Sequence, residues 1–176
     1  MFIHIVSLIC LGVAAVAASG AQFYGYGSDI KGLPLFYSDG TAYLGHSPPS
    51  DASVATNITL VTKHASDKSF TATPTNSSIV DAGNWTSPML FIDNTVGAFS
   101  AAGFTSIINA TTTNIGFDLW GTLLVWIGDS GDITTKWYAE PVDSQNLTFV
   151  LKWNVDNVAT ETARPVVLKS PRSTKG

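Results

Sequence analysis

An all-β fold is predicted by two features of the sequence. No segment places apolar residues at the i, i+3, i+4, i+7 spacing of an amphipathic helix, whereas several short segments alternate apolar and polar residues. Valine, isoleucine, threonine and aromatic residues, which suit a pleated and half-buried surface, are frequent along the chain. About eight to eleven short strands at this spacing favour a two-sheet antiparallel β-sandwich, with a closed β-barrel or a β-trefoil as the alternative.

Turn residues and alternation locate the strands along the chain. Ser38-Asp39-Gly40 marks a hairpin because Asp and Gly readily adopt the positive φ angles of tight turns, and the stretch 128–132 marks a second one in the same way. Pro34 cannot donate to a ladder, so it places the start of its strand at an edge. We therefore expect strands, in chain order, at 33–37, 41–45, 57–63, around Phe70, 89–92, 103–108, 115–124 with an interruption at Gly121, 122–127, 133–139, 146–156 and 165–168.

The clearest alternation runs from Asn146 to Asp156. Apolar side chains occupy one parity and predict a face that packs in the core: Leu147, Phe149, Leu151, Trp153 and Val155. Polar side chains occupy the other parity and predict a face in contact with water: Asn146, Thr148, Lys152 and Asn154. In the strand expected at 57–63, Ile58 and Leu60 mark the inward face in the same way.

The N-terminal segment has the composition of a secretion signal. Residues 2–18 are almost wholly apolar and precede the small residues Ser19-Gly20-Ala21, which places cleavage before Gln22, with a cut after Ala18 as the alternative. The only cysteine, Cys10, lies inside this signal, so we expect a secreted chain that is stabilised by its core without a disulfide. The predicted organisation is a signal peptide at 1–21, a single β domain at 22–168 and a flexible basic tail at 169–176.

Five Asn-x-Ser/Thr sequons follow the signal, where about two would arise by chance from the composition. We expect N-glycosylation at Asn57, Asn76, Asn84, Asn109 and Asn146. Alternation places the first and last of these on the solvent faces of strands, and the other three are expected in loops. A binding surface is therefore expected where sequons are absent, with the hairpins at 37–46 and 126–138 as candidates.

Sparse charge and missing motifs exclude several partners and cofactors. Charged residues make up 12% of the chain and the net charge is −4, which argues against nucleic acid as a partner. No segment after the signal is long and apolar enough to predict a membrane span in the mature chain. His46 and His64 are isolated, and no Gly-rich phosphate loop opens a helix, so we expect no metal site and no cofactor.

Catalytic residues are scarce. The sequence has no Gly-x-Ser-x-Gly elbow, and no cysteine follows the signal, which disfavours a nucleophilic mechanism. Carboxylate catalysis is the alternative, because Asp118 interrupts the aromatic run at 117–120 and would form a glycosidase-like pair with Glu140 if the fold brought the two acids together. The expected assignment is a non-enzymatic protein, with Asp118 and Glu140 as the catalytic alternative.

Aromatic side chains are the remaining candidates for ligand contact, because sugar rings stack their apolar faces on Trp and Tyr. Trp85 lies inside the sequon at 84–86 and is expected to be exposed, and Trp137 and Tyr138 point to opposite faces of one strand. The candidate ligand-binding residues are Trp85, Trp137 and Tyr138, chosen from a wider set that also contains Tyr24, Tyr26 and Trp126. The tryptophans expected mainly in the core are Trp120, Trp126 and Trp153.

Four segments resemble an uncharacterised family of small secreted proteins of filamentous fungi. They are GLPLFYSDGTAYLG at 32–45, WYAEP at 137–141, LKWN at 151–154 and PVVLKS at 165–170. The resemblance implies a fungal cell-wall or secreted protein. It carries over no catalytic or binding residue.

The sequence therefore predicts a secreted, N-glycosylated and non-enzymatic protein of the cell surface or extracellular space, with cell-wall polysaccharide or another extracellular protein as the candidate partner. Two alternatives belong to other classes. One is a secreted glycan-active hydrolase that uses Asp118 and Glu140, which predicts a cleft lined by paired acids. The other is an effector that binds a host protein through an exposed edge strand, which predicts a flat apolar patch without sequons.

Overall fold

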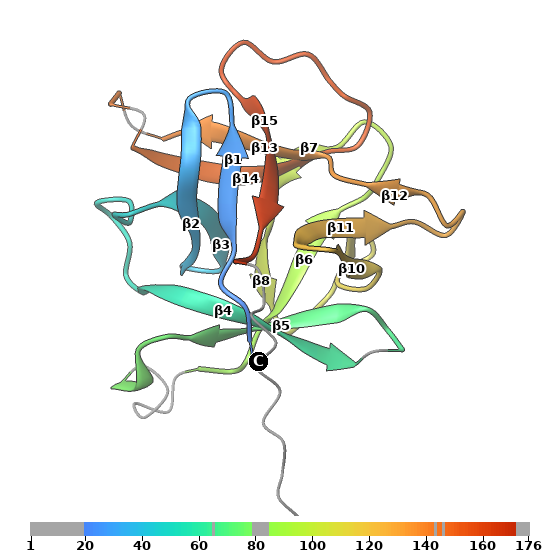
Figure 1. Cartoon of the computed structure of the whole chain (residues 1–176), viewed down its shortest axis with the longest axis horizontal. Helices are drawn as coiled ribbons and strands as arrows, with labels where there is room; N and C mark the ends of the chain where they lie inside the picture. The colour runs from blue at the N-terminus through green and yellow to red at the C-terminus, as the bar shows by residue number, and fades with distance from the viewer. Residues whose placement is uncertain (1–19, 65, 79–84, 143, 146, 172–176) are drawn as a thin grey trace, which may run out of the picture.

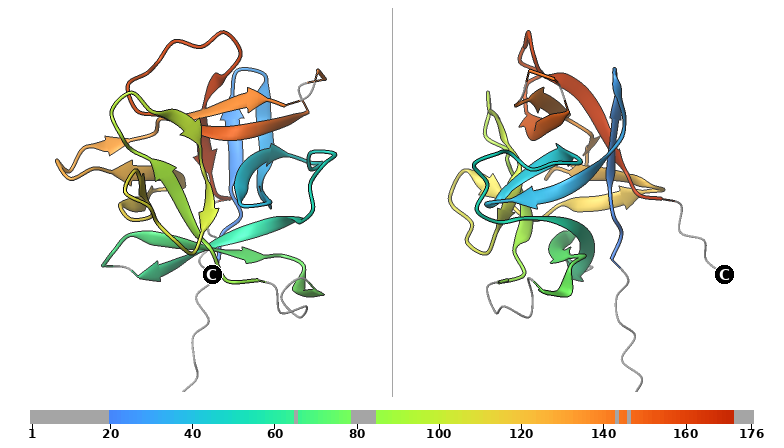
Figure 2. Two further views of the ribbon diagram at one scale, coloured as in Figure 1. Left: turned by 180° about the vertical axis from the view of Figure 1, so that it is seen from behind. Right: turned by 90° about the vertical axis from the view of Figure 1, so that its left-hand side faces the viewer.

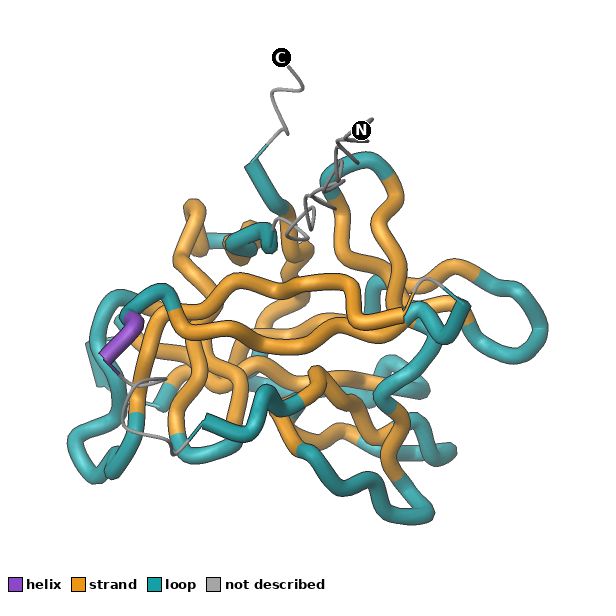
Figure 3. Tube along the Cα trace, turned by 90° about the horizontal axis from the view of Figure 1, so that it is seen from below, coloured by secondary structure: helices purple, strands orange, loops and turns teal. Residues whose placement is uncertain are grey.

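The computed structural model describes residues 20–171 except 65, 79–84, 143 and 146. Of the predicted signal peptide at 1–21, only Gly20 and Ala21 fall within the described residues, and 172–176 of the predicted tail fall outside them. Regular structure in the described part is almost entirely β, with helical residues only at 77–78 (Figure 3). No helix in this part of the chain is long and apolar enough to cross a membrane.

The described residues form fifteen strands in one connected sheet. They are β1 (Tyr24–Gly27), β2 (Ile30–Ser38), β3 (Thr41–Gly45), β4 (Ala55–His64), β5 (Ser69–Pro74), β6 (Met89–Asp93), β7 (Phe99–Ala101), β8 (Gly103–Thr105), β9 (Thr112–Thr113), β10 (Phe117–Trp120), β11 (Leu123–Ile127), β12 (Ile133–Thr134), β13 (Trp137–Pro141), β14 (Thr148–Asn154) and β15 (Arg164–Lys169).

Ten of these strands close into an antiparallel barrel (Figures 1 and 2). Around the ring their order is β1, β2, β4, β5, β6, β8, β3, β14, β13 and β15, and β15 pairs with β1 to close it. The predicted two-sheet sandwich is therefore wrong, and the closed barrel given as its alternative is confirmed. Alternating side chains define an inner and an outer face in both architectures, so alternation alone does not distinguish them.

Local turn chemistry explains the predicted hairpin between β2 and β3. Ser38 pairs with Thr41, so the turn has two central residues, Asp39 and Gly40, whose φ angles are 45° and 85°. Both angles are positive, as in the type I′ turn that matches the twist of a hairpin. The Asp39 carboxylate accepts hydrogen bonds from the backbone N–H groups of 53–54, both at 2.8 Å, which ties the turn to the segment before β4.

The remaining strands lie outside the ring. β7 pairs with β14, β9 pairs with β6, and the hairpin β10–β11 joins the ring through β15 (Figure 1). Gly121, with φ of 64°, turns the chain between β10 and β11, where the sequence predicted one interrupted strand. The predicted return strand at 133–139 is divided, because β12 pairs with β11 whereas β13 pairs with β14 and β15.

The core contains a cluster of fully buried aromatic rings. Trp137 and Trp153 meet edge to face with their ring centroids 4.7 Å apart, and Phe117 stacks on Trp137 at 6.3 Å. Trp137 Nε1 donates to the Leu124 carbonyl at 3.2 Å, so the one polar atom of the indole is satisfied. Since Phe117 and Leu124 belong to β10 and β11, this hairpin covers part of the core.

β14 departs from its predicted alternation at both ends. The centre of the strand is buried as predicted, at Phe149, Leu151 and Trp153. Leu147, predicted in the core, precedes the strand and is 59% exposed. Thr148 and Asn154, predicted on the wet face, are buried because loops fold over them. Thr148 Oγ1 donates to the Ser47 carbonyl at 2.9 Å, and the Asn154 amide exchanges hydrogen bonds of 2.7 and 2.9 Å with the backbone of Val158.

Candidate functional site

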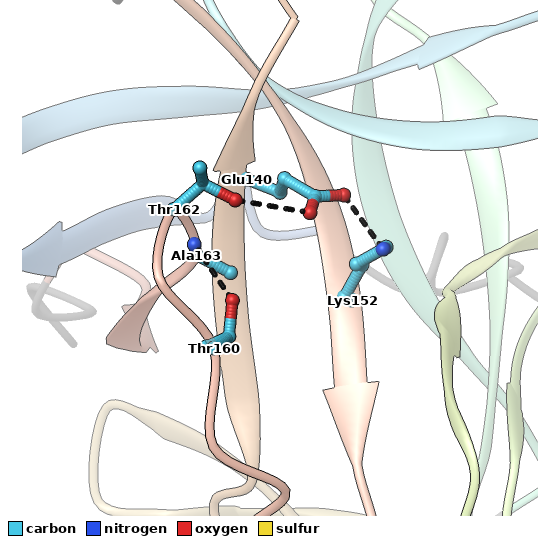
Figure 4. Close-up of polar contacts among 5 residues, drawn as sticks. All are labelled: Glu140, Lys152, Thr160, Thr162 and Ala163. Atoms are coloured by element: carbon cyan, nitrogen blue, oxygen red, sulfur yellow. Dashed lines mark hydrogen bonds and ion pairs between the residues drawn. The ribbon is translucent and has the colours of Figure 1, made fainter.

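The two acids of the catalytic alternative lie on different strands and are each held by a lysine. Asp118 Oδ2 in β10 lies 3.1 Å from Lys68 Nζ. Glu140 Oε2 in β13 lies 2.6 Å from Lys152 Nζ, and its Oε1 accepts a hydrogen bond from Thr162 Oγ1 at 3.3 Å (Figure 4). The two acids share no hydrogen bond and no ion-pair partner among the described residues, whereas the carboxyl groups of a glycosidase face each other across roughly 5–10 Å. The structure does not bring these acids together.

Trp137 and Tyr138 point to opposite faces of β13, as the alternation predicts. Trp137 belongs to the core and is 0% exposed, so it offers no surface to a ligand. Tyr138 lies on the outer face, where its ring packs edge to face with Phe99 at 5.7 Å. Lys152 Nζ lies 4.5 Å from the centre of the Phe99 ring, so Tyr138 adjoins a packed cluster at the surface.

The other tryptophans differ in exposure. Trp85, predicted to be exposed, is half-buried: its Nε1 donates to the Ala72 carbonyl at 3.1 Å, and its ring lies 4.9 Å from that of Tyr37. Trp126 is half-buried against the core. Trp120, predicted in the core, is 66% exposed. Among the described tryptophans it is the one most available to a ligand.

Three of the five sequon asparagines fall on described residues, and all three are exposed. Asn57 lies on the outer face of β4, as the alternation predicts. Asn76 and Asn109 lie in loops, and the Oδ1 of each accepts a hydrogen bond from the hydroxyl two residues later, at 2.7 Å from Ser78 Oγ and 2.9 Å from Thr111 Oγ1. The sequon residues outside the described part are Asn84 and Asn146.

Four neighbouring strands, β10, β11, β15 and β1, carry no sequon (Figure 1). Their register aligns a row of outward side chains. Trp120 of β10 lies opposite Leu123 of β11. Lys169 of β15 lies opposite both Leu123 and Tyr24 of β1. Directly opposite residues share a face of the sheet, so these side chains stand side by side, and Tyr26 follows two residues after Tyr24 on the same face. We name these five residues the aromatic strip.

The strip faces solvent because residues of the opposite parity on β11 and β15 pack in the core. Leu168, next to Lys169 in β15, is fully buried. Tyr26 is 41% exposed, and Lys169 Nζ lies 5.6 Å from the centre of its ring. Tyr24 donates its hydroxyl proton to Gln22 Oε1 at 2.9 Å. The strip thus combines exposed aromatic rings with polar groups at their edges.

Sequence reasoning named Tyr24 and Tyr26 among its wider candidates but assigned Trp120 to the core. Two features indicate that Trp120 is exposed. It directly precedes the turn at Gly121, and it lies on the same face of β10 as Asp118 and on the opposite face from the buried Phe117. The alignment of the strip is not visible in the sequence, because its strands lie at opposite ends of the chain and in its later half.

Hollows in the surface gather around the segment that follows β3. Three cavities, of about 160, 450 and 570 Å³, all have Ser47 in their lining. His46 lines two of them, and Tyr43 and Asp51 line the largest. Burial raises the pKa of the Tyr43 hydroxyl above its ordinary value of 10.0, and the negative charges of Asp51 and Asp39 raise it further.

Comparison with known proteins assigns no family. No protein-family model, no curated protein and no solved structure matches the chain. Within the part of the chain that the structure describes, no group of three or more His, Cys, Asp and Glu side chains is placed to hold a metal ion.

Proposed function

We propose that this is a secreted, N-glycosylated, non-enzymatic protein that binds extracellular polysaccharide, such as that of a cell wall, through the aromatic strip. The observation that carries the proposal is the register that aligns Trp120, Lys169 and Tyr24 on one outward face. The apolar segment at 2–18 and the excess of sequons support export from the cell.

The chemistry of the strip suits a sugar polymer. The C–H faces of a sugar ring stack on Trp and Tyr rings, while the Tyr24 hydroxyl oxygen can accept a hydrogen bond from a sugar hydroxyl and the Lys169 ammonium can donate one to a sugar oxygen. Four adjacent strands place Trp120 roughly 14 Å from Tyr24, which is longer than one sugar ring. A flat surface of that length fits several units of a polymer, whereas a small ligand needs a concave site.

Two further observations support binding without catalysis. Asp118 and Glu140 lie on different strands, and each forms an ion pair with a different lysine. They therefore do not form the acid and base pair of a glycosidase. None of the five sequons lies on β1, β10, β11 or β15. The strands that form the strip therefore carry no N-glycan of their own.

Binding to insoluble polymers tests the proposal. The protein is produced by secretion from a glycosylating eukaryotic host and sedimented with chitin, β-glucan or mannan, and soluble fragments are titrated against tryptophan fluorescence. The Trp120→Ala and Tyr26→Ala variants are each expected to lower affinity about two- to twelvefold, since one aromatic contact contributes about 0.5–1.5 kcal/mol. The fluorescence change on binding should disappear with Trp120→Ala.

Tyr138→Ala is the control, because Tyr138 is a partly exposed tyrosine that is not part of the strip and whose ring packs against Phe99. It should bind like the parent protein. A parent protein that sediments with none of the polymers would refute the proposal. Equal affinity of the parent and of the strip variants would show that the strip is not the binding surface.

A further inference from the structure

The smallest of the three cavities lies beside a sequon. It has a volume of about 160 Å³, and its lining includes Phe36 of β2, His46-Ser47-Pro48 of the segment after β3, and Asn57 of β4. Phe36 is 4% exposed although it lies on the outer face of β2, where its neighbour Leu35 points into the core. The segment at 46–48 therefore shields the Phe36 ring and leaves a hollow between this segment and β4.

Register sets Asn57 next to that ring. Phe36 lies opposite Tyr43 of β3 on one side and opposite Asn57 of β4 on the other. Directly opposite residues have Cβ atoms about 4.5–5.5 Å apart on the same face, so a group attached to Asn57 Nδ2 begins at the edge of the Phe36 ring. The Phe36 and Tyr43 rings are stacked with centroids 5.6 Å apart. We name Tyr43, Phe36 and Asn57 the covered row.

The other described sequons have a different setting. The Oδ1 atoms of Asn76 and Asn109 are engaged by hydroxyls within their own loops. The Asn57 side chain makes no hydrogen bond within the described residues; only its backbone carbonyl is engaged, by Thr75 and Thr56. Its exposed amide is therefore free to take the orientation that an attached sugar requires.

We propose that the N-glycan at Asn57 is part of the fold, with its first N-acetylglucosamine packed in this cavity against Phe36 and Pro48. The inference rests on the N-glycosylation in the proposed function. The cavity of about 160 Å³ admits one edge of the sugar ring, since a cavity of about 150 Å³ accepts benzene, and the rest of the sugar lies outside it. The sugar's apolar face covers the Phe36 edge, and its hydroxyl and acetamido groups remain in contact with water and with the polar lining. The glycans at Asn76 and Asn109 only extend into solvent.

Thermal unfolding of sequon variants tests the inference. In protein secreted from a eukaryotic host, Asn57→Gln should lower Tm by about 3–5 °C, whereas Asn76→Gln and Asn109→Gln should leave it within about 1 °C. Trimming with an endoglycosidase that leaves one N-acetylglucosamine on each asparagine should preserve the Tm of the parent. Protease cleavage within 46–54 should be faster in Asn57→Gln than in the other two variants.

Bacterial expression supplies the control for the substitution itself. Without glycans, Asn57→Gln and the parent should have the same Tm, since the amide makes no contact that glutamine would lose. The inference is overturned if mass spectrometry finds Asn57 bare while Asn76 and Asn109 carry glycans, if Asn57→Gln shifts Tm no more than Asn109→Gln, or if trimming lowers Tm as much as Asn57→Gln. Polysaccharide binding by the strip is measured separately and should be unchanged in Asn57→Gln, so failure of either proposal is recognised on its own.

Discussion

Two cross-strand rows of aromatic side chains lie on the outside of the barrel, and they differ in what covers them. In the covered row, the segment 46–48 leaves Phe36 only 4% exposed, and Phe36 stacks on Tyr43. In the aromatic strip, Trp120 is 66% exposed at the end of its strand, and no loop in the described part of the chain shields it. Both rows follow from the same register rule, so the loops decide whether an outward aromatic residue stabilises the fold or remains available to a partner.

Polar contacts hold the segment that covers Phe36 in place. The segment after β3 is tied down where Thr148 Oγ1 donates to the Ser47 carbonyl, and the Asp39 carboxylate bonds the backbone at 53–54. Nothing comparable crosses β1, β15 and β11 in the described part of the chain, where Lys169 and Tyr24 stand at the surface. Because an exposed aromatic row contributes little to folding, its presence calls for a functional explanation.

The largest expected contrast is in the stability of two aromatic deletions. Phe36→Ala should lower the free energy of unfolding by about 3–5 kcal/mol, because it leaves a cavity under the covering segment. Trp120→Ala should change it by only about 0.5 kcal/mol, because an exposed side chain loses little packing. Urea unfolding of the unglycosylated proteins measures both. Similar losses in the two variants would contradict the comparison.

A second prediction concerns the segment that leads into the strip. Ala21 exchanges two backbone hydrogen bonds with Leu60 of β4, at 2.9 and 2.8 Å, and so links β1 to the strand that carries Asn57. Cleavage before Gln22 would remove both bonds, whereas the alternative cut after Ala18 would keep them. A chain that starts at Gln22 should be less stable than one that starts at Ser19 by about 1–2 kcal/mol.

Intact mass of the secreted protein identifies the mature terminus, and urea unfolding compares the two chains. Equal stability of both chains would contradict this prediction.

The sequence predicted the buried faces of strands and the positions of turns better than it predicted which strands pair. Alternation correctly placed Ile58 and Leu60 in the core, and Asp39-Gly40 marked a real two-residue turn, because both signals are local. Closure of the ring depends on β1 meeting β15 from the far end of the chain, which no local pattern encodes. Asn154 was misassigned because a polar side chain on a strand is buried when a loop supplies its hydrogen bonds.

The candidate site was predictable to a smaller extent. The aromatic residues considered from the sequence included Tyr24 and Tyr26, which the structure places at the surface of β1. Trp137 was misplaced because parity alone does not state which face of β13 is inward. Trp120 was missed because a tryptophan is buried in most β domains, and its exposure arises from the turn at Gly121 that ends its strand.

A smaller effect is expected from the bond that fixes the covering segment. Thr148→Val keeps the shape of the side chain but removes the donor to the Ser47 carbonyl, which should lower the free energy of unfolding by about 1 kcal/mol. The same change should speed protease cleavage within 46–54 and should leave polysaccharide binding by the strip unaffected. Unchanged cleavage in this segment would show that the bond does not secure the cover.

The smallest expected effect concerns the stability of the covered row at alkaline pH. Because burial and then Asp51 and Asp39 raise the pKa of Tyr43 above 10.0, the folded protein keeps a proton that the unfolded chain loses. The stabilisation is therefore complete below pH 10.0 and is lost as the pH rises through the higher pKa of the folded state. Tyr43→Phe lacks this titration, so its stability should fall less steeply between about pH 9 and 11. Asp51→Asn should give an intermediate slope, since it removes one of the charges but not the burial. Parallel curves of stability against pH for all three proteins would show that the covering segment does not control the ionisation of this hydroxyl.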